Sequence, residues 1–502
     1  MAENPMLKFV SVPRITPEKR EAHDRKDDFG EIYREFAAGR AAEQASRCSQ
    51  CGVPYCQSHC PLHNDIPDWL RLTAEGRLRE AYEVSQATNT FPEICGRICP
   101  QDRLCEGNCV IEQSGHGTVT IGAVEKYVTD TAFAEGWVEA IAPLAERPES
   151  VGIIGAGPGG LAAADRLRRA GVQVTVYDRY DRAGGLLSYG IPGFKLEKEV
   201  VERRNRQLEE GGVAFVLGCE VGRDITFAEI REKHDAVIVA TGVYKSRELD
   251  AANADAGGVV KAIDYLTASS KKYFGDAVPL FDDGTLDADG KRVVVIGGGD
   301  TAMDCVRTAV RQGATSVKLL YRRDRANMPG SQREVANAEE EGVQFEWLTL
   351  PGGFEVDLRV TVTAEVGPIG PEAQGSGIRP NPVSGVRVQR MRLGEADATG
   401  RQRPEVIEGS DYVEGADLVI KALGFEPEAL PTLWDQPDLE VTRWGTIKAD
   451  FRTHETGMPG VYAVGDIVRG ASLVVWAIRD GRECADAILD RFAASSARVA
   501  AE

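Results

Sequence analysis

The sequence predicts an α/β protein in which an N-terminal α-helical domain precedes two Rossmann-like dinucleotide-binding domains, the second inserted in the first. Three observations support this prediction. Eight of the 11 cysteines lie between residues 48 and 109, and strand–glycine-turn–helix patterns follow at 149–178 and 291–325. We therefore expect the chain to divide into residues 1–145, 146–288, 289–425 and 426–502, the last segment completing the first dinucleotide-binding domain.

Length, composition and charge limit the class of protein. A chain of 502 residues is long enough for several domains, and 42% hydrophobic residues with 54 glycines fit a globular enzyme. The net charge of −19 argues against nucleic acid and against an acidic membrane surface as partners. No apolar run approaches the ~20 residues of a membrane-spanning helix, and the N-terminus lacks the apolar segment of a signal peptide. We therefore expect a cytoplasmic protein without membrane or nucleic-acid partners.

The N-terminal domain is predicted to be helical on both sides of its cysteines. The amphipathic segment from Asp28 to Arg47 is expected to form a docking helix that buries Ile32, Phe36 and Ala41. Residues 61–94 are expected to form a helical hairpin, with Pro67 in a first helical turn.

The eight cysteines form two groups of four with CxxC-like or CxxxC-like spacing. Disulfides are disfavoured because the chain is large and shows no secretory signal. Zinc and iron–sulfur clusters both use such thiolates, and the Cys-Pro pairs at 60–61 and 99–100 favour iron–sulfur without excluding zinc. The two groups are Cys48, Cys51, Cys56 and Cys60, and Cys95, Cys99, Cys105 and Cys109.

The first glycine motif predicts a dinucleotide site. An apolar strand enters Gly155-x-Gly157-x-x-Gly160, a helix follows, and a second strand ends on Asp178. The glycines permit the tight turn, the close approach of pyrophosphate and the packing of helix on strand. Because an acid at the end of the second strand can bind a free ribose 2′-hydroxyl, we expect FAD or NAD rather than NADP here.

The second glycine motif predicts a different nucleotide. The strand at 293–296 enters Gly297-x-Gly299-x-x-Ala302, and the strand after the helix ends at Tyr321. Arg322 and Arg323 then stand where the first motif has an acid. Guanidinium groups pair with phosphate, so this arginine pair favours the 2′-phosphate of NADP. Two dinucleotide-binding folds, one for a two-electron donor and one for a flavin, give a reason for redox centres and none for zinc. This favours iron–sulfur over zinc at the cysteines.

Apolar strands run into glycine turns at 240–242 and 422–424, where we expect the chain to cross from one domain to the other. A last strand ends at Gly465-Asp466, where a carboxylate and turn amides are expected to face a polyol or phosphate. A β-meander without assigned chemistry is expected at 351–415, and Lys195 is expected to be a surface charge.

These motifs also carry a resemblance. The two glycine motifs with the turns at 240–242 and 465–466 resemble the two-dinucleotide flavoprotein disulfide reductase group over residues 151–490. Together with the cysteine motif at 47–69 and GGLLSYGIPGFKL at 184–196, the whole chain resembles the small (β) subunit family of bacterial glutamate synthase. The N-terminal half of dihydropyrimidine dehydrogenase shares this architecture.

The resemblance implies FAD on the outer dinucleotide domain, NADPH on the inserted one, and two [4Fe–4S] clusters. One cluster would take Cys48, Cys51, Cys56 and Cys109, and the other Cys60, Cys99 and Cys105 with either Glu125 or Cys95 as fourth ligand. The FAD-binding residues would be Gly155, Gly157, Pro158, Gly159, Gly160, Asp178, Arg179, Gly184, Gly185, Leu186, Ile191, Val221, Thr241, Gly242, Gly465, Asp466, Leu473 and Val474. The NADPH-binding residues would be Gly297, Gly299, Asp300, Thr301, Arg322, Arg323, Ala422 and Gly424.

The implied function is electron input. NADPH would reduce FAD, and electrons would pass through the clusters to a large FMN-containing subunit, the glutamate synthase α subunit, which makes L-glutamate from L-glutamine and 2-oxoglutarate. A hetero-oligomer of αβ units is expected, and no acid–base catalyst is assigned in this chain. An NADPH:ferredoxin-type reductase with another partner is the alternative. A thioredoxin-reductase-like enzyme would need a CxxC in the inserted domain, where Cys305 stands alone.

Overall fold

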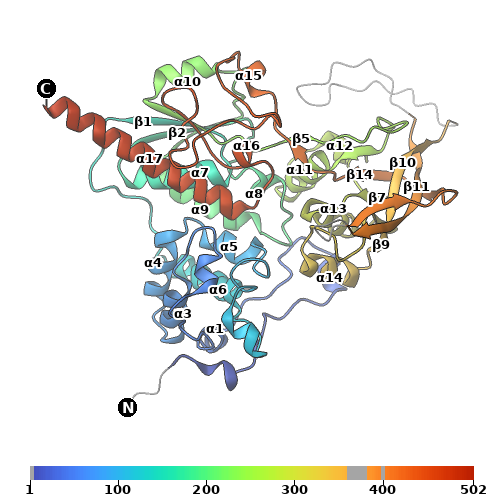
Figure 1. Ribbon diagram of the computed structural model, residues 1–502, viewed down its shortest axis with the longest axis horizontal. Helices are drawn as coiled ribbons and strands as arrows, with labels where there is room; N and C mark the ends of the chain where they lie inside the picture. The colour runs from blue at the N-terminus through green and yellow to red at the C-terminus, as the bar shows by residue number, and fades with distance from the viewer. Residues whose placement is uncertain (1–4, 359–380, 397–401, 502) are drawn as a thin grey trace.

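Short helices surrounding the cysteine loops form the N-terminal domain (Figure 1). A computed structural model describes residues 5–358, 381–396 and 402–501. The buried side chains of Trp69, Tyr82 and Val124 lie in one core with Cys48, which confirms a helical domain folded around cysteines. Its elements are η1 (Lys8–Val10), η2 (Asp24–Lys26), α1 (Ala38–Ala45), α2 (Tyr55–Ser58), α3 (Ile66–Ala74), α4 (Leu78–Thr88), α5 (Pro92–Ile98), η3 (Val110–Ser114) and α6 (Ile121–Ala134).

The helix expected from Asp28 to Arg47 is shorter than predicted. Only α1 is helical there, although Ile32, Phe36 and Ala41 are all buried as expected. The chain before α1 is extended, because Tyr33 forms a β-bridge with Lys19 and Ile32 N donates to Phe194 O at 3.3 Å. Tertiary contacts therefore override the local helical pattern in this segment.

A five-stranded parallel sheet in the order β16-β4-β1-β2-β3 forms the first dinucleotide-binding domain. Strand β16 comes from the C-terminal segment, so this domain is interrupted and then completed as expected. The strands are β1 (Ser150–Ile154), β2 (Gln173–Asp178), β3 (Ala214–Leu217), β4 (Ala236–Val239) and β16 (Val461–Ala463). The helices are α7 (Pro158–Arg169), α8 (Leu186–Tyr189), α9 (Lys198–Glu210), α10 (Phe227–Lys233), α15 (Leu430–Leu433), α16 (Asp466–Arg469) and α17 (Val474–Ala501).

A second parallel sheet in the order β6-β14-β7-β8-β9 forms the inserted domain. Its strands are β6 (Val259–Lys261), β7 (Arg292–Ile296), β8 (Ser316–Tyr321), β9 (Gln344–Trp347) and β14 (Leu418–Lys421), and its helices are α11 (Ala262–Tyr273), α12 (Pro279–Asp282), α13 (Asp300–Arg311) and α14 (Gln332–Glu340). An antiparallel sheet of β10 (Thr349–Val356), β11 (Val383–Ala396), β12 (Gln402–Val406) and β13 (Tyr412–Gly415) lies beside it. This sheet is the described part of the expected meander, whereas 359–380 and 397–401 lie outside the described residues.

The inserted domain begins earlier than the expected residue 289. Strand β6 belongs to its sheet, and Tyr265 of α11 lies in the same core as Met303 of α13. The chain passes between the two domains through the short pair β5 (Lys245–Ser246) and β15 (Phe425–Glu426). The three-residue strand β6 gives too weak a periodicity to mark this start in the sequence. No helix in the described ranges is long and apolar enough to span a membrane.

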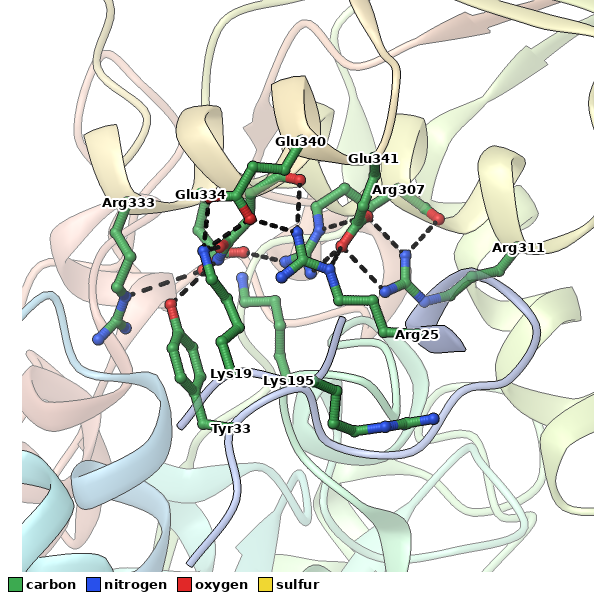
Figure 2. Close-up of polar contacts among 12 residues, drawn as sticks. Lys19, Arg25, Tyr33, Lys195, Arg307, Arg311, Arg333, Glu334, Glu340 and Glu341 are labelled. Carbon is green, nitrogen blue, oxygen red and sulfur yellow. Dashed lines mark hydrogen bonds and ion pairs between the residues drawn. The ribbon is translucent and has the colours of Figure 1, made fainter. Parts of the chain in front are cut away.

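A buried ion-pair network joins the N-terminal segment to the inserted domain (Figure 2). The fully buried Arg25 reaches α14, where its guanidinium lies 2.6 Å from Glu340 Oε2 and 3.0 Å from Glu341 Oε1. Arg307 and Arg311 of α13 bind the same Glu341 carboxylate at 2.9 and 2.7 Å. The segment before α1 is therefore held against the inserted domain by charges that water does not screen.

Lys195 adds a contact from the first dinucleotide-binding domain. It was expected on the surface, but its side chain is 15% exposed and its Nζ donates to Asp304 Oδ1 of α13 at 2.8 Å. The network thus joins all three domains. Burial alone would raise the pKa of Glu341, but hydrogen bonds from Arg311 and Arg307 lower it to about 2. Its contribution to stability is therefore present above its ordinary pKa of 4.5 and is lost as the pH falls toward 2.

Replacing Glu341 by Gln should destabilise the protein strongly, because three arginines would remain buried without this carboxylate. We expect a loss of about 3–5 kcal/mol in denaturant unfolding at neutral pH. The control is Glu340→Gln, since the neighbouring Glu340 side chain is 44% exposed, and we expect about 1 kcal/mol or less. Equal small losses for both variants would contradict a structural role for the buried network.

Candidate functional site

The structure gathers the cysteines into two sets that do not follow chain order. The first set consists of Cys48, Cys51, Cys56 and Cys109. Burial raises the pKa of Cys56 to about 12, and the charges of Cys48, Cys109 and Cys51 raise it further. Cys109 thus lies with the first three cysteines, although it stands 53 positions after Cys56 in the chain.

The second set consists of Cys60, Cys95, Cys99 and Cys105, with the carboxylate of Glu125 beside them. Burial raises the pKa of Cys60 to about 12, and the charges of Cys95 and Glu125 contribute. Cys95 and Cys99 are one turn apart at the end of α5 and their thiols share a hydrogen bond. Both expected alternatives for a fourth ligand, Glu125 and Cys95, therefore lie at this set.

Glu125 is held by polar groups that the sequence did not single out. It is 7% exposed, and its Oε1 accepts hydrogen bonds from Asn64 Nδ2 at 3.1 Å, Asn89 Nδ2 at 3.3 Å and Ser85 Oγ at 3.4 Å. Burial raises its pKa to about 8. All three hydrogen bonds end on one carboxylate oxygen, which leaves the second oxygen for another partner. Asn64 precedes α3, Asn89 follows α4 and Ser85 lies within α4, so no local pattern in the sequence singled them out.

The spacing of the thiols fits a cluster better than a single ion. Thiolates around one zinc lie about 4 Å apart, given a Zn–S distance of ~2.3 Å. In the described part of the chain no three of the eight thiols have sulfur atoms within 4.8 Å of one another. Two separate sets of thiols suit iron–sulfur clusters, for which thiolates are the usual ligands.

The first glycine motif lines a cavity of ≈ 2260 Å³ at the carboxyl ends of the first sheet. The expected FAD-binding residues that line it are Gly155, Gly157, Pro158, Gly159, Asp178, Arg179, Leu186, Val221, Thr241, Gly242, Gly465, Asp466, Leu473 and Val474. Residues of the inserted domain, among them Asp264 and Lys421, line the same cavity, so it extends into the space between the two domains.

Local geometry at this turn fits a pyrophosphate. Gly155 has φ 111°, and a Cβ there would lie 2.3 Å from Ala240 O, whereas a Cβ on Gly157 would meet nothing within 4 Å. Asp178 Oδ2 accepts from Ala156 N at 2.6 Å and so holds the turn. Thr241 Oγ1 is buried and has no hydrogen-bond partner among the described residues, so it can accept a hydrogen bond from a ligand or donate one to it.

Several cavity residues were missed from the sequence. Tyr244 lies under the Arg179 guanidinium, which is 4.8 Å from its ring centroid, and Arg179 also donates to Glu428 Oε1 at 2.9 Å. Tyr244 lies two residues after Gly242, so an aromatic residue close behind that turn was an available signal. Burial raises the pKa of Asp466 to about 7.

Four expected FAD-binding residues support the site from outside the cavity. Gly160 packs on the first turn, where a Cβ would lie 2.0 Å from Gly155 O. Gly184 N donates to Ala156 O at 2.8 Å, and a Cβ on Gly185 would lie 2.9 Å from Gly157 Cα. Ile191 packs against the core of the domain. That core contains the cavity residues Leu187, Leu473 and Val474 together with Cys60, Cys95 and Cys99.

The second glycine motif lies outside the cavity. Gly297 has φ 150°, a Cβ on it would lie 2.3 Å from Ala422 O, and the space beside Gly299 is open. Arg322 is exposed, and the buried Nε of Arg323 has no hydrogen-bond partner within the described ranges. Both follow β8, as expected. The described residues of this motif thus offer unpaired guanidinium donors and an open turn, which fit a phosphorylated nucleotide. The other residues expected to bind NADPH are Asp300 and Thr301 at the start of α13, and Ala422 and Gly424 after β14.

Comparisons with known proteins match both halves of this arrangement. The family described as dihydropyrimidine dehydrogenase domain II, 4Fe-4S cluster, matches residues 25–137. The pyridine nucleotide-disulphide oxidoreductase family matches residues 149–367 and 384–481. The NADPH complex of FprA from Mycobacterium tuberculosis shares the fold, with a TM-score of 0.54 and 20% identity over 70% of this chain and 86% of that chain.

Similarity to curated proteins extends over almost the whole chain. It is 63% identical over 488 residues to the glutamate synthase [NADPH] small chain of Azospirillum brasilense, covering 97% of this chain and 96% of that protein. It is 71% identical over 432 residues to a putative glutamate synthase [NADPH] small chain of Cereibacter sphaeroides, covering 86% and 97%. The chain therefore belongs to the family of glutamate synthase [NADPH] small chains.

Proposed function

We propose that this chain is the NADPH-oxidising electron-input subunit of glutamate synthase. Membership of the family makes it an NADPH-dependent oxidoreductase with iron–sulfur and flavin cofactors. The FAD held by this chain would supply the conversion of a two-electron hydride from NADPH into single electrons. The observation that carries the proposal is the cavity at the first glycine motif, whose wall shares one core with Cys60, Cys95 and Cys99.

The residues of the chain would bind and orient the flavin and no acid–base catalyst is required. The open turn at Gly157 and the start of α7 would take the pyrophosphate. The start of α17 would face the flavin through Leu473 and Val474, both at the cavity wall. The N-terminus of α17 is the positive end of the helix dipole and would stabilise the anionic reduced flavin.

The proposed ligands of two [4Fe–4S] clusters follow the two thiol sets. Cys48, Cys51, Cys56 and Cys109 would hold one, and Cys60, Cys99, Cys105 and Glu125 the other. Glu125 is favoured over Cys95 because one of its oxygens already accepts three hydrogen bonds, which fix the carboxylate in place. The thiol of Cys95, by contrast, is engaged with Cys99 and with Asn89 Oδ1 at 3.7 Å.

The proposed partner is the large FMN-containing α subunit, joined in αβ units of a hetero-oligomer. Relatives named as small chains support this partner. An NADPH:ferredoxin-type reductase with another acceptor is the second candidate. It shares every cofactor, so only the partner distinguishes the two functions.

Replacing Glu125 by Ala should remove the second cluster, whereas Cys95→Ala should retain it. We expect about half of the iron and sulfide to be lost from anaerobically purified Glu125→Ala, because one of two thiolate-held clusters loses a ligand. Iron analysis and the electron paramagnetic resonance of the reduced protein measure this. The opposite pattern, with loss in Cys95→Ala only, would assign the fourth position to the thiol.

Replacing both Arg322 and Arg323 by Ala should raise the KM for NADPH at least tenfold and leave the KM for NADH almost unchanged. A hydrogen bond to a charged group contributes about 1.5–3 kcal/mol, and only NADPH carries the 2′-phosphate. Steady-state diaphorase assays with both nucleotides measure the two constants. Equal increases for NADPH and NADH would show that these arginines do not bind the 2′-phosphate.

The isolated chain should oxidise NADPH with an artificial acceptor but produce no glutamate. Adding the large subunit should couple NADPH oxidation to L-glutamate formation from L-glutamine and 2-oxoglutarate, because those reactions need a second active site. Affinity purification of the native complex, followed by assay of glutamate, tests this. Recovery of a ferredoxin-like acceptor in place of the large subunit would support the second candidate.

A further inference from the structure

A loop of the cysteine-rich domain contacts the nucleotide end of the inserted domain. This loop, residues 100–104, lies between two cysteines of the second set, Cys99 and Cys105. Arg103 Nη1 donates to Pro329 O at 3.1 Å, and its Nη2 lies 3.8 Å from Asp300 Oδ2. A side chain from one domain thus stands at the glycine turn of another, 197 residues further along the chain (300 − 103).

The segment that Arg103 contacts folds over the glycine turn. Gly330 N donates to Gly298 O at 3.0 Å, and Ser331 N donates to Asp300 Oδ1 at 2.9 Å. A Cβ on Gly330 would lie 3.2 Å from Gly298 O, so this side of the turn is filled. The open side is at Gly299, where a Cβ would meet nothing within 4 Å. Asp300, the residue next to this open space, is the one that Arg103 approaches.

A pyrophosphate at the first turn of α13 would need a nearby cation. Helix N-termini bind phosphate, but here the first residue of α13 is Asp300, whose carboxylate would repel a pyrophosphate. Arg103 forms an ion pair with this carboxylate, whereas Lys195 donates to Asp304 and Arg325 pairs with Glu339 at 2.7 Å. The Arg103 side chain is 47% exposed and, among the described residues, donates one hydrogen bond. Most of the five N–H donors of its planar guanidinium remain available to bind a phosphate.

We propose that Arg103 is an NADPH-binding residue supplied by the cysteine-rich domain. Its guanidinium pairs with the pyrophosphate of NADPH at the first turn of α13 and offsets the charge of Asp300. This inference rests on the proposed NADPH site and extends it, because the nucleotide site is then complete only when the cysteine-rich domain is docked. Arg322 and Arg323 bind the adenosine 2′-phosphate, and Arg103 binds the other phosphates.

Two ligands distinguish the proposed role of Arg103 from that of Arg322 and Arg323. NADP⁺ carries the pyrophosphate and the 2′-phosphate, whereas adenosine 2′-monophosphate carries only the latter. Equilibrium dialysis against the full chain loaded with its flavin and clusters gives both Kd values without turnover. In Arg103→Ala we expect the Kd for NADP⁺ to rise about tenfold or more, because a charge-assisted hydrogen bond is lost. The Kd for adenosine 2′-monophosphate should stay within about twofold, since the two sites are independent.

Two further variants control the interpretation. Arg79→Ala removes an arginine of the same domain whose side chain is 61% exposed on α4, and it should change neither Kd. Asp300→Asn in the Arg103→Ala background should recover part of the NADP⁺ affinity, because the unpaired carboxylate is removed. An unchanged Kd for NADP⁺ in Arg103→Ala, or an equal rise for both ligands, would overturn the pyrophosphate contact. Failure of the unmodified chain to bind NADP⁺ would instead contradict the proposed function itself.

Discussion

The relative placement of the domains depends on the buried ion pairs that the Glu341 carboxylate forms. Arg25 from the N-terminal segment and Arg307 and Arg311 from α13 all bind it in a place from which water is excluded. Removing charges from water costs several kcal/mol for each ion, so none of these groups can be withdrawn alone at low cost. The covalent passage between the two dinucleotide domains is only the pair β5 and β15. The buried ion pairs therefore fix the orientation of the domains more than the β5–β15 connection does.

That fixed orientation explains how distant loops can share a nucleotide site. Lys195 holds α13 from the first dinucleotide-binding domain, and Arg25 holds α14 from the N-terminal side. Between these two attachments, Arg333 Nη1 donates to Gln101 Oε1 at 3.2 Å and brings the cysteine loop to the inserted domain. Arg103 lies two residues further on. Its position at the glycine turn is thus a consequence of the network and would be lost if the inserted domain rotated.

The sequence predicted what depends on local backbone geometry and little of what depends on distant partners. The turns at Gly155 and Gly297 were predictable because only glycine accepts their φ values and the contacts of their missing Cβ atoms. The arginines after β8 were predictable from the same local register. The positions of Arg25, Lys195 and the three donors around Glu125 were not predictable, since each depends on partners far away in the chain. A charged residue gives no local signal that a carboxylate from another domain will cover it.

The order of the proposed electron route follows from which thiols share a core with the flavin cavity. Cys95 and Cys99 pack in the core that contains Leu187 and Leu473 of the cavity wall. Cys48 and Cys56 pack instead in the core of the helical domain, and Cys60 contacts both cores. Under the proposed ligand sets, electrons that leave the flavin would meet the second set first and the first set next. Cys51, Cys56 and Cys109 are only half-buried, and Val53 beside them is 67% exposed, so an acceptor would approach at this end.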